Sequence, residues 1–243
     1  MFQTCIFDLY GTLVDIKTDE EDSALWEKLT LFYNYYQAGY TPSELKKTYE
    51  SVTKEFMKGK QSLRNDTHES FPEIQIEDVF QKLFTLRGIN ADKTLAIHSG
   101  QFFRVLSTRH LQLYSGTLKM LEALKKAEKK VYLLSNAQRI FTEYEMKALG
   151  IYDCFDKIYI SSDYDYKKPD VKFFEQLLLE CKIDKKTAIM IGNDGICDIK
   201  GAKNAGLHTL YVHSNISPEE PLPDADYVLP EMDMQKIENI LLG

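Results

Sequence analysis

The chain has 243 residues and a formal net charge of −7, and 44% of its residues are hydrophobic. This length allows one large domain or a core with a smaller second domain, and the hydrophobic share is enough for a sizeable buried core. An acidic surface of this kind repels a phosphate backbone, so the composition argues against nucleic acid as a partner.

The cysteines and the hydrophobic runs predict a cytoplasmic protein without a membrane partner. Four cysteines stand far apart, at positions 5, 154, 181 and 197, and no CxxC pair supports a zinc site or a disulfide framework. The N-terminus has no basic start, and its short apolar stretch meets an acid at Asp8, so we expect no signal peptide. No apolar run approaches the roughly 20 residues that a membrane helix needs.

The first hydrophobic segment predicts a buried strand. Residues 2–7 are mostly apolar, and the segment ends at Asp8, which is followed by a turn at residues 10–12. The stretch from about residue 15 to residue 94 has a different character, because it is rich in Glu, Lys, Leu and aromatic residues at helical spacing. We expect this stretch to form an α-helical cap domain, inserted after the first strand.

The rest of the chain alternates between helices and strands. A helix over about 95–109 opens this part, and strands are predicted at 131–134, 157–160, 188–191, 208–212 and 227–229, with helices between them. This alternation predicts an α/β fold with a doubly wound parallel sheet, built from residues 1–14 and 95–243. Ligands of such sheets bind at the carboxyl ends of the strands, and the cap would lie over those ends.

Four of the predicted strand ends carry polar side chains. They are Asp8, Ser135 with Asn136, Lys168, and Asp194 with Asp198. Each of these alone is more typical of a turn, a helix cap or the surface than of a catalytic site. Because the strand ends of a parallel sheet share one rim, however, we expect all of these side chains to face one crevice.

This combination of groups suits phosphoryl transfer. A carboxylate can attack phosphorus and give an acyl phosphate, which water then hydrolyses. Because the carboxylate and the phosphate are both anions, their charge must be compensated, which a lysine and an Mg²⁺ ion held by carboxylates can do. Hydroxyl and amide groups supply hydrogen bonds to the oxygens of the transferring group.

Four motifs around these residues occur in a characteristic order. They are FDLYGTL at 7–13, LSN at 134–136, KPD at 168–170 followed by Phe174, and IGND at 191–194 followed by DIKGAKNAG at 198–206. In this set the sequence resembles the haloacid dehalogenase (HAD) superfamily of hydrolases. The resemblance spans nearly the whole chain, apart from a cap that is similar only in kind, and it implies a Rossmann-like core.

The resemblance also implies a role for each residue at the rim. The implied catalytic residues are the nucleophile Asp8, Ser135 as a contact to the transferring group, and Lys168 as the orienting and neutralising cation. The implied substrate contacts are Thr12, Asn136 and Tyr10. The implied ligands of Mg²⁺ are Asp8, the backbone carbonyl of Tyr10, and Asp194, with Asp198 as the second or alternative acid.

Tyr10 departs from the phosphatase pattern of this family. Phosphatases usually carry a second Asp at this position, two residues after the nucleophile, where it acts as the general acid. The dehalogenases of the family typically have a tyrosine here, as this chain does. A tyrosine, with a pKa of about 10, could donate a proton weakly.

Two other features favour a phosphatase. Asp194 and Asp198 resemble the metal motif of the phosphatases, although Asn193 stands directly after Gly192 and the first acid comes one residue later. The dehalogenases need no metal and receive the departing halide with a cap arginine, whereas residues 15–63 contain no arginine.

We therefore expect an Mg²⁺-dependent phosphatase that acts on a small phosphorylated metabolite through an aspartyl-phosphate intermediate. Two alternatives stay open. One is a metal-independent 2-haloacid dehalogenase that forms an aspartyl ester, and the other is a phosphate-binding homologue that has lost turnover. The sequence specifies neither the substrate nor an oligomeric state.

Overall fold

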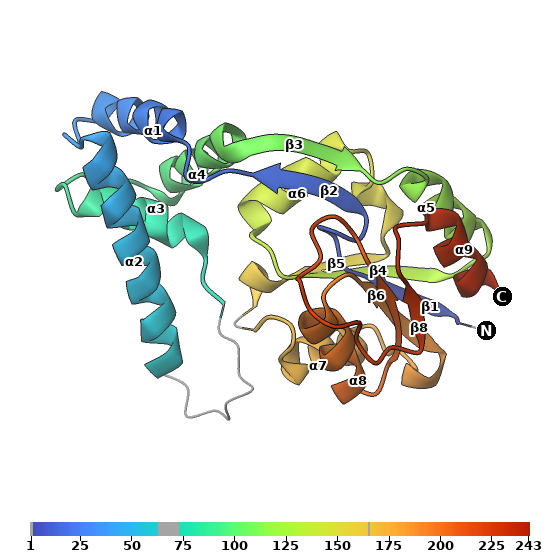
Figure 1. Cartoon of the computed structure of the whole chain (residues 1–243). Coiled ribbons are helices and arrows are strands. Elements are labelled where there is room, and N and C mark those ends of the chain that lie inside the picture. Colours follow the sequence, from blue (N-terminus) through green and yellow to red (C-terminus); the bar gives the residue numbers. More distant parts are fainter. Residues whose placement is uncertain (1, 63–72, 165) are drawn as a thin grey trace.

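The computed structural model describes residues 2–62, 73–164 and 166–243, and it consists of a sheet-based core and a helical insertion (Figure 1). The core contains a six-stranded sheet in the order β5-β4-β1-β6-β7-β8. Its strands are β1 (Thr4–Phe7), β4 (Lys130–Ser135), β5 (Lys157–Ile160), β6 (Ala188–Gly192), β7 (His208–Val212) and β8 (Tyr227–Leu229). All neighbouring strands of this sheet are parallel, which confirms the predicted α/β fold.

Helices cover both faces of the sheet, as its hydrophobic strands require. They are α5 (Thr117–Lys126), α6 (Arg139–Ala148), α7 (Val171–Glu180), α8 (Gly201–Asn204) and α9 (Met234–Leu242). Shorter helical turns lie between them, namely η1 (Tyr152–Cys154), η2 (Ser161–Asp163), η3 (Lys185–Thr187) and the π-helical turn η4 (Gly195–Lys200). Strand β1 shows how the faces divide, because Cys5 and Phe7 pack in a cluster with α5 and α9, whereas Ile6 packs in a second cluster with α7.

The insertion has a hydrophobic core of its own. Its helices are α1 (Ser23–Tyr35), α2 (Pro42–Ser62), α3 (Ile76–Thr85) and α4 (Lys93–Ser107). This core combines aliphatic and aromatic side chains, and the ring of Tyr33 stacks on that of Phe84 with 4.2 Å between the ring centroids. These four helices therefore share a hydrophobic cluster distinct from the two sheet clusters, and Ile140 of α6 joins this cluster from the core.

Helix α4 differs from the sequence analysis, which assigns residues from 95 onward to the core. Ala96 and Phe103 of this helix are buried in the hydrophobic cluster of the insertion. The apolar face of an amphipathic helix indicates that the helix packs on something, but the periodicity does not say on which partner. Residues 95–107 consequently extend the helical insertion beyond its expected end.

A two-stranded antiparallel ribbon connects the insertion to the core (Figure 1). It consists of β2 (Val14–Thr18) and β3 (Thr108–Leu113), neither of which the sequence analysis predicts. Both strands are largely polar and partly exposed, so they lack the hydrophobic run that reveals the strands of the main sheet. None of the described helices is long and apolar enough to cross a bilayer.

Candidate active site

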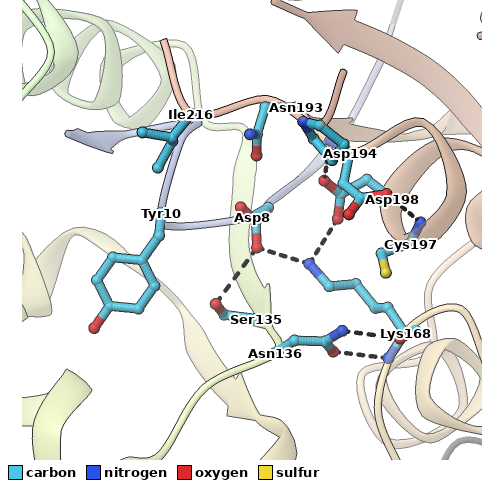
Figure 2. Close-up of a pocket in the computed structure, with 11 residues that line it drawn as sticks. Asp8, Tyr10, Ser135, Asn136, Lys168, Asn193, Asp194, Cys197, Asp198 and Ile216 are labelled. Atoms are coloured by element: carbon cyan, nitrogen blue, oxygen red, sulfur yellow. Dashed lines mark hydrogen bonds and ion pairs between the residues drawn. The ribbon is translucent and has the colours of Figure 1, made fainter. Parts of the chain in front are cut away.

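The carboxyl ends of three adjacent strands bring the predicted site residues together. Asp8 directly follows β1, Ser135 ends β4, and Asn193 directly follows β6. The side chains border a cavity of about 210 Å³, which we call the catalytic cavity (Figure 2). Its lining includes Asp8, Tyr10, Ser135, Asn136, Lys168, Asn193, Asp194, Cys197, Asp198, Ile216 and Pro218.

Lys168 is the centre of a buried ionic cluster. Its Nζ lies 2.7 Å from Oδ1 of Asp8 and 2.7 Å from Oδ1 of Asp198, and the three side chains are 2%, 10% and 1% exposed. Asn136 holds the backbone of Lys168 at both ends, because its Oδ1 accepts from the Lys168 amide and its Nδ2 donates to the Lys168 carbonyl, each at 2.8 Å. Asn136 thus positions the lysine, and its expected contact with substrate stays a prediction.

The cluster contains two carboxylates for one cation. Burial alone would lower the pKa of Lys168, but Asp198 and Asp8 outweigh burial and hold this pKa above its ordinary value. Burial also raises the pKa of Asp198, to about 7, and the nearby charge of Asp8 adds to this effect while Lys168 opposes it. The cluster is therefore short of positive charge while both acids are ionised.

Thr12 and Asn193 complete the surroundings of Asp8. The Oγ1 atom of Thr12 lies 3.3 Å from Oδ2 of Asp8 and 3.3 Å from Oδ1 of Asn193, and both neighbours of Asp8 are buried. Gly11 allows this approach: its φ is 83°, and a Cβ added there would lie only 2.3 Å from Nδ2 of Asn193. On the other side of Asp8, the Ser135 hydroxyl donates to Oδ1 at 3.4 Å.

Asp194 has a local structural partner. Its Oδ1 accepts hydrogen bonds from the amides of Ile196 and Cys197, at 2.9 and 2.7 Å, so it caps the first turn of η4. Its own amide donates to Oδ2 of Asp198 at 3.0 Å. Figure 2 shows the capped carboxylate on the Cys197 side of the cavity, with Asn193 nearer to Asp8.

Asp8, Asp194 and Asp198 all line the same cavity, as expected, and the choice of metal ligands among them stays a prediction. Within the described residues, no group of three or more His, Cys, Asp or Glu side chains is arranged to hold a metal ion. Asp194 and Asp198 are engaged by backbone amides and by Lys168, as set out above. The side chain that the structure places beside Asp8 is Asn193, whose position directly after Gly192 was its only signal in the sequence.

The hydroxyl of Tyr10 points away from Asp8 (Figure 2). It donates to Oε2 of Glu145 at 2.5 Å and lies 3.1 Å from Oγ1 of Thr142. Burial raises the pKa of Tyr10 well above its ordinary value, and the negative charge of Glu145 raises it further. The tyrosine that the sequence analysis considers a weak proton donor is thus committed to another carboxylate.

Glu145 also forms an ion pair across the boundary between core and insertion. Arg104 of α4 binds it with Nε to Oε1 at 2.6 Å and Nη2 to Oε2 at 3.2 Å. The Arg104 guanidinium additionally lies 5.6 Å from the centroid of the Tyr10 ring. Neither charged residue is predicted from the sequence, because no local pattern relates two residues that are 41 positions apart.

A loop after β7 forms another wall of the catalytic cavity. Ile216 and Pro218 of this loop line the cavity. Nδ2 of Asn193 donates to the hydroxyls of Ser214 and Ser217, each at 3.4 Å, which ties the loop to the strand end beside Asp8. This loop carries no recognisable motif, so only the structure reveals its contribution.

The fold and this site define a hydrolase of a known class: the chain belongs to the haloacid dehalogenase-like hydrolase family, whose model matches residues 2–206. The chain is 22% identical to the putative HAD-hydrolase YfnB of Bacillus subtilis, over 98% of this chain and 94% of that protein. It is 29% identical to the glyceraldehyde 3-phosphate phosphatase of Methanothermobacter thermautotrophicus over 45% of this chain. It is 26% identical to the pyrimidine 5'-nucleotidase PynA of Streptococcus pneumoniae over 54% of this chain. The last two alignments span about half of those relatives, 49% and 55% of their lengths.

Solved structures show the same fold at low sequence identity. The 2-haloacid dehalogenase of Pseudomonas syringae matches with a TM-score of 0.65 and 20% identity, covering 99% of this chain and 98% of that one. The magnesium-bound structure of YfnB matches with a TM-score of 0.57 and 18% identity, covering 99% and 98%. At these identities the likeness concerns the fold, and it is shared by a dehalogenase and by a magnesium-bound hydrolase.

Proposed function

We propose that this hydrolase is a phosphatase that acts on a small phosphorylated metabolite through a phosphoryl-Asp8 intermediate. The observation that carries the proposal is the position of Lys168, with its Nζ 2.7 Å from Asp8 on the wall of the catalytic cavity. The lysine orients the Asp8 carboxylate through this ion pair, and it supplies positive charge where a phosphate dianion would arrive.

The proposed reaction has two steps, phosphoryl transfer to Asp8 and hydrolysis of the phosphoryl-Asp8. An oxygen of Asp8 forms a bond to phosphorus while the bond to the leaving-group oxygen breaks, and the electron pair departs with that oxygen. Water then attacks the phosphoryl-Asp8, which releases inorganic phosphate and restores the carboxylate, and a proton from water ends on the leaving alcohol. Lys168 offsets the negative charge of both steps, and the Ser135 hydroxyl lies beside Oδ1 of Asp8, where it can donate to a phosphoryl oxygen.

The residues around Asp8 fit one Mg²⁺ ion, with a donor set that differs from the expected one. Oδ2 of Asp8 and Oδ1 of Asn193 both face the Thr12 hydroxyl, which has a single proton for two acceptors. Mg²⁺ commonly binds one or two carboxylates together with substrate oxygens. In this proposal Asp8, the amide oxygen of Asn193 and the backbone carbonyl of Tyr10 hold the ion, which would neutralise the phosphate when bound.

The relatives support the proposal without carrying it. Two of the matching proteins are named as phosphatases of small molecules, a glyceraldehyde phosphate and a pyrimidine nucleotide. The YfnB structure is described as bound to magnesium. The names of the two phosphatases are consistent with a small phosphorylated substrate, and the YfnB structure is consistent with an Mg²⁺ ion.

A 2-haloacid dehalogenase is the second candidate, and Tyr10 and Asn193 favour it. Tyr10 occupies the place of the phosphatase general acid, and Asn193 stands beside Asp8 where a further carboxylate would strengthen a metal site. The charge of the surroundings argues against it, because a haloacid carries a carboxylate and releases a halide. Arg104, the arginine nearest to Tyr10 among the described residues, is already neutralised by Glu145. A phosphate-binding homologue without turnover, the third candidate, would not need the nucleophile Asp8.

The test is a direct comparison of the two reactions. Release of inorganic phosphate from aryl, acyl and sugar phosphates is measured beside release of halide from a 2-haloacid, each with Mg²⁺ and with EDTA. The proposal expects phosphate release that EDTA stops. Halide release that persists in EDTA would establish the dehalogenase instead, and the absence of both reactions would favour the binding protein.

A further inference from the structure

A second cavity, of about 350 Å³, lies between the insertion and the core and adjoins the catalytic cavity. We call it the cap chamber. Tyr10 and Asn136 line both cavities, so the two meet at these side chains. A phosphate held at Asp8 would therefore direct the rest of its molecule into the cap chamber.

Aromatic rings form most of the apolar wall of the chamber. Tyr49 and Phe103 come from the insertion, and Tyr10 and Phe141 come from the core. Tyr49 and Phe103 contact each other with 5.2 Å between their ring centroids. Such walls favour a planar or aromatic group, because rings stack on rings and both lose contact with water.

Most of the polar groups in the chamber already have partners. The amide of Gln138 donates to the Ile74 carbonyl at 3.0 Å, and its oxygen accepts from the Ile76 amide at 2.9 Å. Arg104 is bound by Glu145 through two hydrogen bonds. The Gln138 amide is therefore occupied, and the charge of Arg104 is offset by Glu145, although the guanidinium keeps further N–H donors.

Glu20 is the exception among the charged residues that line the chamber. It follows β2, and its carboxylate forms no hydrogen bond or ion pair with another described residue. The Glu20 side chain lines the chamber and is also exposed to solvent. Partial burial raises the pKa of its carboxyl group, against the opposing charge of Arg104. The chamber lining carries one cation, Arg104, and one anion, Glu20. Because Arg104 is ion-paired with Glu145, which lies outside the lining, the Glu20 carboxylate is the charged group of the lining without an ion-pair partner among the described residues.

We propose that Glu20 selects neutral or cationic aromatic leaving groups over anionic ones in the cap chamber, where the leaving group of a phosphate held at Asp8 would lie. The inference rests on the proposed phosphatase function and names the substrate class of that site. A second anion on the leaving group would meet the carboxylate of Glu20 on the chamber wall, and like charges close together near a protein surface repel each other. A cation would be attracted by the same carboxylate and by the aromatic faces.

The experiment uses three phosphate esters of matched shape: phenyl phosphate, 4-carboxyphenyl phosphate and 4-(aminomethyl)phenyl phosphate. For the unmodified protein, kcat/KM should fall from the cationic to the neutral to the anionic ester, with about tenfold or more between the two extremes. In Glu20→Gln this ratio should fall toward one. Glu21→Gln is the matched control, because it removes the same charge from the neighbouring, largely exposed residue outside the chamber, and it should keep the ratio.

Affinities of the same three esters for the Asp8→Asn protein, measured by calorimetry, provide a readout without turnover. They should follow the same order. If no ester is hydrolysed but the affinities keep this order, the phosphatase proposal fails and the charge preference of the chamber stands. Equal affinities, or an order that survives Glu20→Gln, would overturn the inference.

Discussion

Two ionic clusters, one buried and one partly buried, lie within the same part of the molecule, and they differ in their charge balance. In the core, Lys168 stands between two carboxylates, Asp8 and Asp198. At the boundary with the insertion, Arg104 faces the single carboxylate of Glu145. The first cluster borders the catalytic cavity, whereas the second binds the Tyr10 hydroxyl between the two parts of the molecule.

The difference in balance indicates a difference in role. A balanced buried pair with its hydrogen bonds satisfied is complete as it stands, and it joins the elements that carry it. An unbalanced cluster keeps a carboxylate that still attracts a cation or a proton, which suits a nucleophile that must meet an anionic substrate beside a metal ion. Under the proposed function, the core cluster would take part in the chemistry and the boundary cluster would hold the cap in place.

The largest effect is expected for Asp8→Asn. The change is nearly isosteric, so the protein should stay folded, but an amide does not attack phosphorus, and kcat should fall by about 10³-fold or more. Steady-state kinetics beside a circular dichroism spectrum provide the check. Retention of more than a few per cent of the activity would rule out covalent catalysis through this residue.

Lys168→Met should affect both activity and stability. It leaves Asp8 and Asp198 buried side by side without their cation, and breaking such a cluster costs about 3–5 kcal/mol of unfolding free energy. Urea unfolding at pH 7 measures this loss. Adding Asp198→Asn should restore part of the stability but not the activity, and a loss below about 1 kcal/mol in the single variant would contradict the account of the cluster.

Glu145→Gln should have a smaller effect, mainly on binding. It leaves the guanidinium of Arg104 without its charge partner in a partly buried place, and a cost of about 1–3 kcal/mol is expected because both side chains keep some exposure. Arg104, which lines the cap chamber, should no longer be held in one position, so KM should rise more than kcat falls. The double variant Arg104→Met with Glu145→Leu should recover stability, and a larger effect on kcat than on KM would place Glu145 in the chemistry instead.

Tyr10→Phe should have the smallest effect. Removing a hydroxyl that donates to Glu145 costs about 1 kcal/mol, and kcat should change by less than about tenfold. Since no general acid is identified beside Asp8, aryl and acyl phosphates should be cleaved much faster than sugar phosphates in both proteins. Rates over a series of esters test this, and a loss in Tyr10→Phe confined to esters with poor leaving groups would make Tyr10 the acid after all.

The sequence predicted the parts of the site that follow hydrophobic strands. Asp8, Ser135 and Lys168 were recognisable because parallel topology gathers strand ends at one rim, and the motifs around them were in order. The neighbour of Asp8 was harder to choose, because a carboxylate at position 194 and an amide at position 193 are both short polar side chains. Only the backbone path after β6 shows that Asn193 faces Asp8.

The contacts between the insertion and the core were beyond the sequence. Glu145 binds Tyr10, which is 135 residues away in the sequence, and no local pattern around either residue predicts this contact. The ribbon of β2 and β3 was hidden by its polar composition, and the apolar face of α4 did not reveal its partner. These contacts depend on how two separately packed parts meet, which periodicity within one segment does not encode.

The central claim, that Asp8 carries the phosphoryl group, is tested most directly by trapping the intermediate. The protein is mixed with an aryl phosphate and Mg²⁺, quenched in acid during turnover, and digested for mass spectrometry. The account predicts a peptide containing Asp8 that is heavier by one phosphoryl group, which is absent without Mg²⁺ and in Asp8→Asn. Continued release of phosphate with no phosphoryl group on Asp8 at any quench time, from a reaction that Asp8→Asn also sustains, would contradict it.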